Sequence, residues 1–367
     1  MTWQQRLWRN PLAKFGITVL LLLYIAVIGA DFFAPYNPYE SQLNGSLLPP
    51  TRIYWRAETG AWVSPYIYPT TQGPVDANTG NRLIEEDRQH PSNIRLLVKG
   101  SEYQILGTNW KSNLHLFGSD GPARLNLLGT DESGRDELSR LLYGGRVSLS
   151  IGLVGVAISF PIGMLVGGIS GYFGGIIDSI LMRLVEVLMT IPFIYLLVAL
   201  NKVLADRTAE LANSFPWLVT SSGRFALIVA ITSLISWAGL ARVIRGEVLS
   251  IKQREFVQAA KGMGAQPLYI IVRHILPQTA TYMIISATLT IPSFIGAESV
   301  LSLIGLGIQQ PDASWGNLLA LATNASILVF QPWLLWPPAL LIVLTVLSFN
   351  LLGDALRDAL DPRTVRR

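Results

Sequence analysis

The chain contains no cysteine, and this absence excludes several kinds of site. No disulfide, thiolate zinc site or cysteine nucleophile can be formed, and nothing follows about the redox compartment. Histidine is nearly as rare, because His90, His115 and His274 are the only three and they are scattered. Neither HExxH nor GxSxG occurs, so no motif indicates a zinc hydrolase or a serine hydrolase.

A phosphate-binding P-loop is also missing. That loop needs the pattern GxxxxGK followed by Ser or Thr. Lys111-Ser112 is the only place where Lys precedes Ser or Thr, and Trp110 stands where the loop needs glycine. The chain therefore cannot cradle ATP by a P-loop.

Charged residues are scarce. They make up 14% of the 367 residues, whereas 50% are hydrophobic and the mean hydropathy is +0.41. This composition is too apolar for a soluble domain of this size and indicates a polytopic membrane protein. A helix needs about 20 mostly apolar residues to cross the hydrocarbon. The segments that qualify are residues 15–33, 147–170, 180–202, 224–243, 280–303 and 332–353.

Clusters of Lys and Arg predict the orientation, because short loops rich in these residues stay in the cytoplasm. The clusters lie in the N-terminal flank, between the fourth and fifth segments, and at the C-terminus. Their members are Arg6, Arg9, Lys14, Arg242, Arg245, Lys252, Arg254, Lys261, Arg273, Arg357, Arg363, Arg366 and Arg367. With six spans all of them fall on one side, which places both termini in the cytoplasm. The opposing basic residues are fewer: Lys202, Arg207 and Arg224.

The first apolar run resembles a signal peptide in its basic flank. No clear small-x-small cleavage site follows Ala30, however, because the next residues are Asp31-Phe-Phe-Ala-Pro. We therefore expect a retained first membrane helix.

Residues 34–146 then lie outside the cytoplasm. They are polar and rich in proline, glycine, asparagine and aromatic residues, with a dense turn signal at residues 76–81. The stretches typical of strands are residues 52–56, 61–63, 66–68, 94–99 and 103–106. We expect a small extracytoplasmic β-rich subdomain. It either contacts a substrate-delivering protein or is an insertion with no contact role.

Residues 255–277 form a polar interruption between the fourth and fifth membrane segments. The residues before Gly264 are good helix formers, and Gly264 can take the left-handed conformation that ends a helix. Pro267 suits the first position of a second helix. Ala259 and Ala260 leave one face of the first helix almost bare, which suits insertion into a groove of another protein. A pair of ordinary amphipathic interfacial helices is the alternative interpretation. His274 is expected at a helix end as a hydrogen-bonding or cationic group.

The pattern Ala259-Ala260, Gly264 and Ile275-Leu276-Pro277 resembles the EAA loop of bacterial ABC importer permeases. In that family the loop docks as a coupling helix into a cleft on the cytoplasmic ATPase. This chain has Gln258 where the family usually has Glu, which leaves open any role that needs the charge. The resemblance implies a coupling site formed by Arg254, Glu255, Gln258, Ala259, Ala260, Lys261, Gly264, Leu276 and Pro277.

Further segments resemble the oligopeptide, dipeptide and nickel branch of that family, in the same order along the chain. They are residues 33–38, 128–146, 301–307, 310–316 and 353–363. The resemblance covers nearly all of the chain except about residues 45–125.

The segment 128–146 is expected to be an amphipathic helix that lies along the membrane interface. One face carries Leu138, Leu141 and Leu142, and other positions carry Arg135, Glu137 and Arg140. Arg135, Glu137 and Arg140 are each expected to anchor the segment at the interface without taking part in transport.

The second membrane segment carries a small residue at every fourth position: Gly155, Ser159, Gly163, Gly167 and Gly171. Such a row gives a flat face that another helix can approach closely, inside this subunit or across a dimer seam. Internal packing is the favoured interpretation for any one glycine.

Glu298 lies within the fifth segment, near the kink expected at Pro292. An ionisable side chain at membrane depth usually faces a cavity or a partner. It is a candidate pathway or gating residue, and a structural carboxylate is the alternative.

The predicted fold is an all-α polytopic membrane protein with six transmembrane helices of the ABC type I importer permease fold. A small β-rich extracytoplasmic insertion is expected between the first two helices. The expected parts are residues 1–35, the insertion 36–130, the permease core 131–353 with the coupling loop 245–279, and the cytoplasmic tail 354–367.

The predicted function is that of a permease subunit in an ATP-driven importer of peptides or similar small solutes in the bacterial inner membrane. The resemblance implies a second homologous permease, two cytoplasmic ATPase subunits and an extracytoplasmic solute-binding protein. Membrane lipid is the remaining partner, and no nucleic acid, cofactor, metal or catalytic residue is expected in this chain. Nickel or other small solutes are an alternative cargo. An ion-driven secondary transporter and an intramembrane hydrolase are rival functions, but Glu298 is the only catalytic candidate inside a span.

Overall fold

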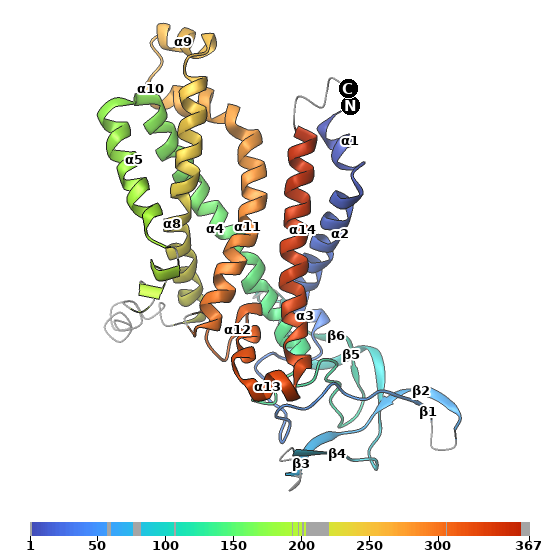
Figure 1. The fold of residues 1–367 in the computed structure, drawn as a ribbon. Helices are drawn as coiled ribbons and strands as arrows, with labels where there is room; N and C mark the ends of the chain where they lie inside the picture. Colours follow the sequence, from blue (N-terminus) through green and yellow to red (C-terminus); the bar gives the residue numbers. More distant parts are fainter. Residues whose placement is uncertain are drawn as a thin grey trace. The chain divides into compact units, whose positions relative to one another are not determined.

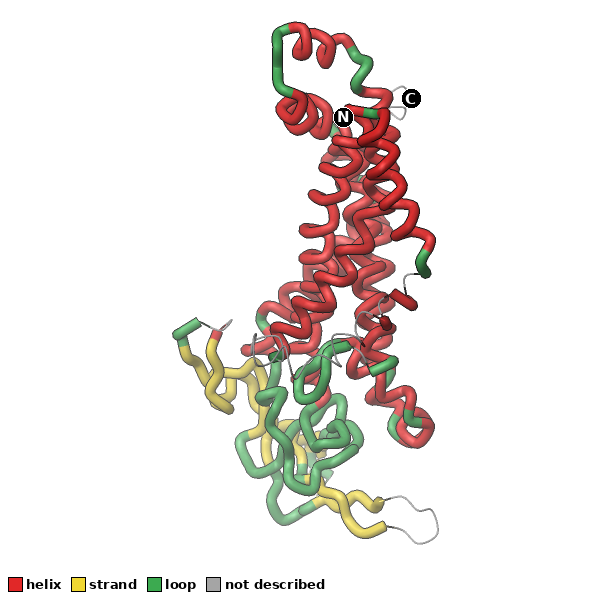
Figure 2. Tube along the Cα trace, turned by 90° about the vertical axis from the view of Figure 1, so that its left-hand side faces the viewer, coloured by secondary structure: helices red, strands yellow, loops and turns green. Residues whose placement is uncertain are grey.

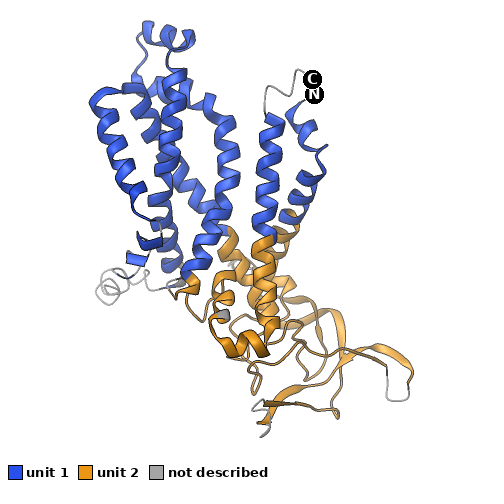
Figure 3. Ribbon diagram, in the orientation of Figure 1, with its two compact units in different colours: residues 1–20, 150–301, 344–367 blue, residues 21–149, 302–343 orange. Residues whose placement is uncertain are grey.

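The computed structural model describes residues 2–56, 60–75, 82–105, 108–192, 194–196, 198–199, 202, 220–305 and 307–360. The chain divides into two compact units, which Figure 3 colours separately. Unit 1 comprises residues 1–20, 150–301 and 344–367, and unit 2 comprises residues 21–149 and 302–343. Several long helices contribute one end to each unit.

Helices make up nearly all of the described part of unit 1 (Figure 1). In chain order the elements that contribute to it are α1 (Trp3–Leu7), α2 (Pro11–Ile28), α4 (Glu137–Phe173), α5 (Gly175–Thr190), α8 (Ser221–Ile251), α9 (Glu255–Gly262), α10 (Pro267–Tyr269), α11 (Ala280–Leu303) and α14 (Trp336–Leu360). A π-helical segment, Ile270–Ile275, and a 3-10 segment, Leu276–Thr279, join α10 to α11.

Five helices of the described residues are long and apolar enough to cross a membrane. They are Pro11–Ile28, Glu137–Phe173, Gly223–Ile251, Pro267–Leu303 and Pro332–Leu360. Each overlaps one of the segments expected from hydropathy. The remaining expected segment, residues 180–202, begins inside α5, and residues 193, 197, 200 and 201 lie outside the described residues. A sixth spanning helix therefore stays a prediction.

The small-residue row of α4 packs against α8 within unit 1. A Cβ added at Gly163 would come 2.9 Å from the carbonyl oxygen of Trp237, and one at Gly171 would come 2.8 Å from that of Arg245. Only glycine allows two helix backbones to approach so closely. For these glycines the favoured interpretation, packing inside the subunit, is confirmed.

The two ends of the chain meet in unit 1. Leu7 and Ala13 form a buried cluster with Ala355, Leu356 and Ala359 of α14. Figures 1 and 2 show α1, the last turns of α14 and α9 at the same end of this unit. The basic residues Arg207, Arg363, Arg366 and Arg367, which entered the orientation prediction, lie outside the described residues.

Unit 2 holds strands β1 (Tyr54–Arg56), β2 (Trp62–Ile67), β3 (Thr70–Val75), β4 (Arg82–Glu86), β5 (Ser92–Gln104) and β6 (Lys111–Ser119). They form an antiparallel four-stranded sheet in the order β1-β2-β5-β6 and a separate hairpin of β3 and β4. Ile67 at the end of β2 forms a buried cluster with Ala123 and Leu125, which follow β6. The short helices of this unit are α3 (Ala30–Phe33), α12 (Trp315–Leu319) and α13 (Ala325–Phe330), with 3-10 turns at Ala320–Thr323 and Pro332–Leu334.

Candidate functional site

The expected corner between two short helices is present at α9 and α10. Gly264 has a φ of +82°, the left-handed conformation that favours glycine. Its N–H donates to the carbonyl of Lys261 at 3.0 Å, and the N–H of Ala265 donates to that of Ala260 at 3.1 Å. This pair of hydrogen bonds is a Schellman motif, which ends the helix. Pro267 occupies the first turn of α10, as predicted.

The face of α9 that points away from the protein differs from the expected one. Ala260 is 2% exposed and joins Val257 in the core of unit 1, so it does not share a bare face with Ala259. Phe256, Ala259 and the C-cap residue Met263 are exposed apolar positions at helical spacing, with Phe256 at 38% and Met263 at 81%. The prediction of a common Ala259-Ala260 face is wrong, because the amphipathic period of α9 turns one alanine toward the π-helical segment.

Gln258 contacts the end of the preceding helix. Its Nε2 donates to the carbonyl oxygen of Lys252 at 2.9 Å. Lys252 is the C-cap of α8, where carbonyl groups have no partner within the helix. A glutamate at position 258 has no proton to donate to this oxygen when ionised. The amide therefore has a structural use that the charged residue of the family pattern lacks.

The other members of the predicted site are divided between surface and core. Arg254, the N-cap of α9, and Glu255 in its first turn are exposed, as is Lys261 in its last turn. The negative charge of Glu255 and the positive charge of Lys261 each suit the helix dipole at their end. Leu276 is 5% exposed and packs in the same core as Ala260.

Pro277 follows the π-helical segment and is exposed. Proline lacks an N–H and cannot complete a regular helical ladder. His274, within the π-helical segment, is half-buried and lies edge-on to the ring of Tyr269, with centroids 5.5 Å apart.

Two cations of α8 hold the corner between α4 and α5. Arg245 binds both carboxylate oxygens of Asp178, with N–O distances of 2.5 and 2.6 Å. Ser170 donates a short hydrogen bond to the same carboxylate. Lys252 Nζ donates to the carbonyl of Gly171 at 2.8 Å and to that of Tyr172 at 3.4 Å. From the sequence, Arg245 and Lys252 were used only as orientation charges, and Asp178 and Ser170 were not singled out.

Glu298 has no exposed surface. It lies in α11, six residues after Pro292, on a helix that begins next to the 3-10 segment. Its complete burial in this structure agrees with a structural carboxylate. The helix also connects Glu298 to the candidate coupling loop through Leu276 and Pro277.

Unit 2 contains a buried ionic cluster where the sequence predicted an interfacial amphipathic helix. Residues 137–146 are the first turns of the long helix α4, and their charges do not face outward. Arg140 and Glu137 are 0% exposed and Arg135 is 6% exposed. The prediction is therefore wrong about the environment of these charges.

Asp131 is the anionic centre of this cluster. It accepts from Arg135 Nε at 2.8 Å, and Arg140 Nε lies 3.3 Å from it. Both arginines also donate to Gln310 Oε1, at 2.6 and 2.9 Å, and Arg140 donates to the carbonyl of Pro311 at 3.0 Å. The cluster ties residues 131–140 to residues 310–311. The hydrophobic period of the helix could not reveal these partners, since they are about 170 residues away.

Asp136 lies beside the cluster and immediately before α4. Its Oδ2 accepts from the backbone N–H and from the hydroxyl of Ser139, both at 2.7 Å. Burial outweighs these hydrogen bonds and raises the pKa of the carboxyl group to about 6.

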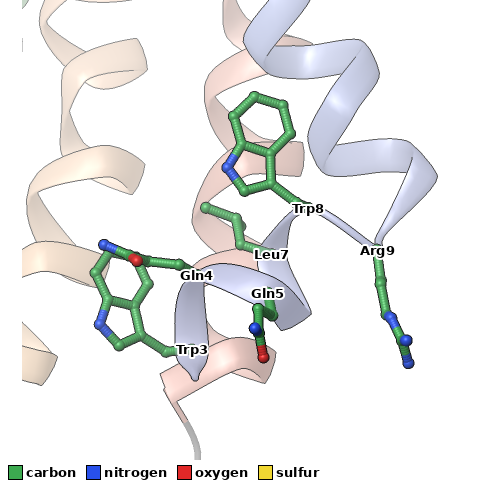
Figure 4. A pocket seen from close by; sticks show the side chains of 6 residues that line it. All are labelled: Trp3, Gln4, Gln5, Leu7, Trp8 and Arg9. Carbon is green, nitrogen blue, oxygen red and sulfur yellow. The ribbon is translucent and has the colours of Figure 1, made fainter. Parts of the chain in front are cut away.

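A surface hollow of about 840 Å³ lies on α1 at the N-terminus (Figure 4). Trp3, Gln4, Gln5, Leu7, Trp8 and Arg9 line it. It contains none of the residues of the predicted coupling site. Tryptophan and arginine in this combination are typical of a membrane–water interface. In the described part of the chain, no group of three or more His, Asp or Glu side chains is placed to hold a metal ion.

Two family models match this chain. The model described as a binding-protein-dependent transport system inner membrane component matches residues 160–366, which is more than half of the chain. The model described as the N-terminal TM domain of oligopeptide transport permease C matches residues 1–50.

Curated relatives resemble the chain over about half its length. The dipeptide transport system permease protein DppC of Bacillus subtilis is 43% identical over 200 residues, covering 54% of this chain and 57% of that protein. The oligopeptide transport system permease protein OppC of Haemophilus influenzae is 42% identical over 199 residues, covering 54% and 57%. OppC of Escherichia coli K12 is 40% identical over 191 residues, covering 52% and 57%. The chain thus spans a little more than half the length of the relatives it matches.

Among solved structures, a chain of the MetNI methionine ABC transporter in inward-facing conformations is 20% identical. Its TM-score is 0.45, with 60% of this chain and 97% of that chain covered.

Proposed function

Because the chain belongs to the family of binding-protein-dependent transport system inner membrane components, we propose that it is a permease subunit of an ATP-driven importer. It forms half of a translocation pathway for peptides or similar small solutes. The observation that carries this proposal is α9, a short helix closed by a Schellman motif at Gly264 that carries exposed side chains beyond the core of unit 1.

The coupling loop has two kinds of residues in this proposal. Phe256, Ala259 and Met263 are exposed and contact the cleft of the ATPase, with Arg254 and Lys261 as supporting charges. Ala260 and Leu276 are buried and hold α9 on the helices behind it. ATP-driven closure of the two ATPase subunits moves α9. The attached helices then switch between inward- and outward-open states, which is alternating access.

The proposed partners are a second homologous permease, two cytoplasmic ATPase subunits and an extracytoplasmic solute-binding protein. ATP hydrolysis belongs to the ATPase subunits, because this chain has no P-loop. The cargo proposal of peptides rests on the names of the DppC and OppC relatives. Nickel or other small solutes are the alternative cargo within the same machinery.

We also propose six transmembrane helices, the additional one continuing from α5, with both termini and α9 on the cytoplasmic side of the bacterial inner membrane. The grouping of α1, α9 and the end of α14 at one end of unit 1 supports a common side for them. The strands between residues 54 and 119 are then extracytoplasmic and offer a surface for the solute-binding protein. Glu298 is proposed to stabilise the arrangement of α11 that gates the pathway.

A glycine substitution tests the coupling role directly. In the left-handed region a β-branched residue is strained by about 1–2 kcal/mol, so Gly264→Val should reopen the end of α9. We expect loss of uptake of radiolabelled trialanine in cells that carry the complete importer, with normal amounts of the variant in the membrane. Gly262→Val is the matched control, because a Cβ there meets nothing within 4 Å and the backbone is helical. Wild-type uptake by Gly264→Val contradicts the coupling mechanism.

A further inference from the structure

Lys252 lies where three elements of unit 1 come together. Its side chain donates to the last carbonyl groups of α4, at Gly171 and Tyr172. Its own carbonyl accepts from the amide of Gln258 on α9. One residue at the end of α8 therefore binds the end of α4 on one side and the candidate coupling helix on the other.

The contact between α4 and α8 has little room for movement at this point. The backbones are close enough at Gly171 that an added Cβ would lie 2.8 Å from the carbonyl oxygen of Arg245. Arg245 and Lys252 are seven residues apart, so they lie on one face of α8. The bidentate pair of Arg245 with Asp178 adds the first turn of α5 to the same contact.

The attachment of α9 to the end of α8 depends on a short turn and on the hydrogen bond of Gln258. Between Lys252 and Glu255 the chain turns, and the hydrogen bond of Gln258 closes this turn at 2.9 Å. The buried side of α9 adds Val257 and Ala260, which pack on Ile270 and Ile271. Gln258 is thus the side chain by which α9 is hydrogen-bonded directly to the end of α8.

We propose that Lys252 and Gln258 are positioning residues that make α9, the end of α8 and the α4–α5 corner one rigid block. This inference rests on the proposed function, in which α9 receives the movement of the ATPase. The block transmits that movement to α4 and α5 without a change in the angle of α9. It also explains why glutamine serves at position 258, since only the amide can donate to the carbonyl of Lys252.

The absence of native cysteine allows a direct distance measurement. Spin labels are attached to a Phe173→Cys, Gly262→Cys double variant in the complete importer, purified through a tag on this chain and reconstituted in liposomes. Both positions are exposed. We expect one narrow distance distribution, the same without nucleotide and with ATP plus vanadate. A second pair, Gly262→Cys with Asp354→Cys on α14, should change its distance between the two states.

The side chains of Lys252 and Gln258 are then replaced in the labelled protein. Lys252→Met and Gln258→Leu should each broaden the distribution between positions 173 and 262 without nucleotide, and should lower the number of trialanine molecules taken up per ATP hydrolysed. Lys252→Arg keeps a donor for the carbonyl groups of α4. It should therefore show the narrow distance distribution and the uptake per ATP of the protein with native Lys252. Gln258→Glu should behave like Gln258→Leu.

The outcomes separate the two proposals. An unchanged distribution in Lys252→Met and Gln258→Leu overturns the proposed positioning role of these two residues. A distance between positions 173 and 262 that shifts with nucleotide in the labelled protein with native Lys252 and Gln258 overturns it as well. If no ATPase subunits copurify, or the distance between positions 262 and 354 does not change with nucleotide, the proposed function fails. In that case the width of the distance distribution without nucleotide, compared between the variants and the protein with native Lys252 and Gln258, still tests the positioning role of these two residues.

Discussion

The proposed coupling loop and the ionic cluster of unit 2 use the same residue types in opposite ways. In the loop, Arg254, Glu255 and Lys261 are exposed, and the shape is held by backbone hydrogen bonds around Gly264. In the cluster, Asp131 and two arginines are buried, and the side chains themselves hold two distant segments together. Charges at a surface that binds a partner remain available, whereas charges that hold a fold are removed from water and must be paired.

The proposed coupling loop is expected on the cytoplasmic side of the membrane, and the strands that precede the ionic cluster are expected on the other side. A labelling experiment should therefore give an all-or-none result. Met263 on α9 is 81% exposed, and Trp110 before β6 is 79% exposed. In right-side-out vesicles a membrane-impermeant maleimide should label the Trp110→Cys variant and leave the Met263→Cys variant unlabelled. Vesicles that are permeabilised and stripped of the ATPase subunits, which are proposed to contact Met263, should show labelling of both variants. Labelling of Met263→Cys in sealed vesicles would contradict the proposed orientation.

Breaking the ionic cluster should have the largest effect on stability. Arg140→Met removes one partner of Asp131 and leaves a buried charge with less compensation, which costs about 3–5 kcal/mol. We expect a large loss of folded protein in the membrane and a lower unfolding temperature of the purified protein.

An exposed pair in the same unit is the matched control. Lys111 lies 3.4 Å from Glu102, and both side chains are more than half exposed. Surface pairs of this kind contribute about 0–1 kcal/mol, so Lys111→Met should leave the unfolding temperature nearly unchanged. Equal effects of Arg140→Met and Lys111→Met would mean that burial does not distinguish the two pairs.

A smaller effect is expected from pH. The pKa of Asp136 is raised from 3.8 to about 6 in the folded protein. The folded state therefore binds this proton more tightly than the unfolded chain, and its stabilising contribution is complete below about pH 4. That contribution is lost as the pH rises through 6, by about 3 kcal/mol.

The Asp136→Asn variant isolates this contribution. Asparagine keeps an oxygen that accepts from Ser139 but does not titrate in this range. Unfolding temperatures measured between pH 4 and 8 should fall less steeply for Asp136→Asn than for the unmodified protein. Identical pH profiles would show that Asp136 does not titrate in the folded state as described.

How much could be predicted from sequence differs between the same two regions. The corner of the coupling loop was predictable, since the conformations of Gly264 and Pro267 depend on local backbone sterics. The orientation of Ala260 was not, because its burial depends on the π-helical segment that packs beneath it. The environment of Arg140 was least predictable, since its partner Gln310 is remote in sequence.

The sequence by itself determined the class of membrane protein, five of the long helices, the family and the corner between two short helices at Gly264. These follow from composition, hydropathy and local conformational preference, which act over a few turns of chain. Tertiary structure alone decided which alanine of α9 faces outward, why position 258 benefits from an amide, and that the charges before the second span are buried. Each of these depends on a contact with a residue outside the local pattern. A charge that the helical pattern places on a surface can instead be buried in the fold, as Arg140 is.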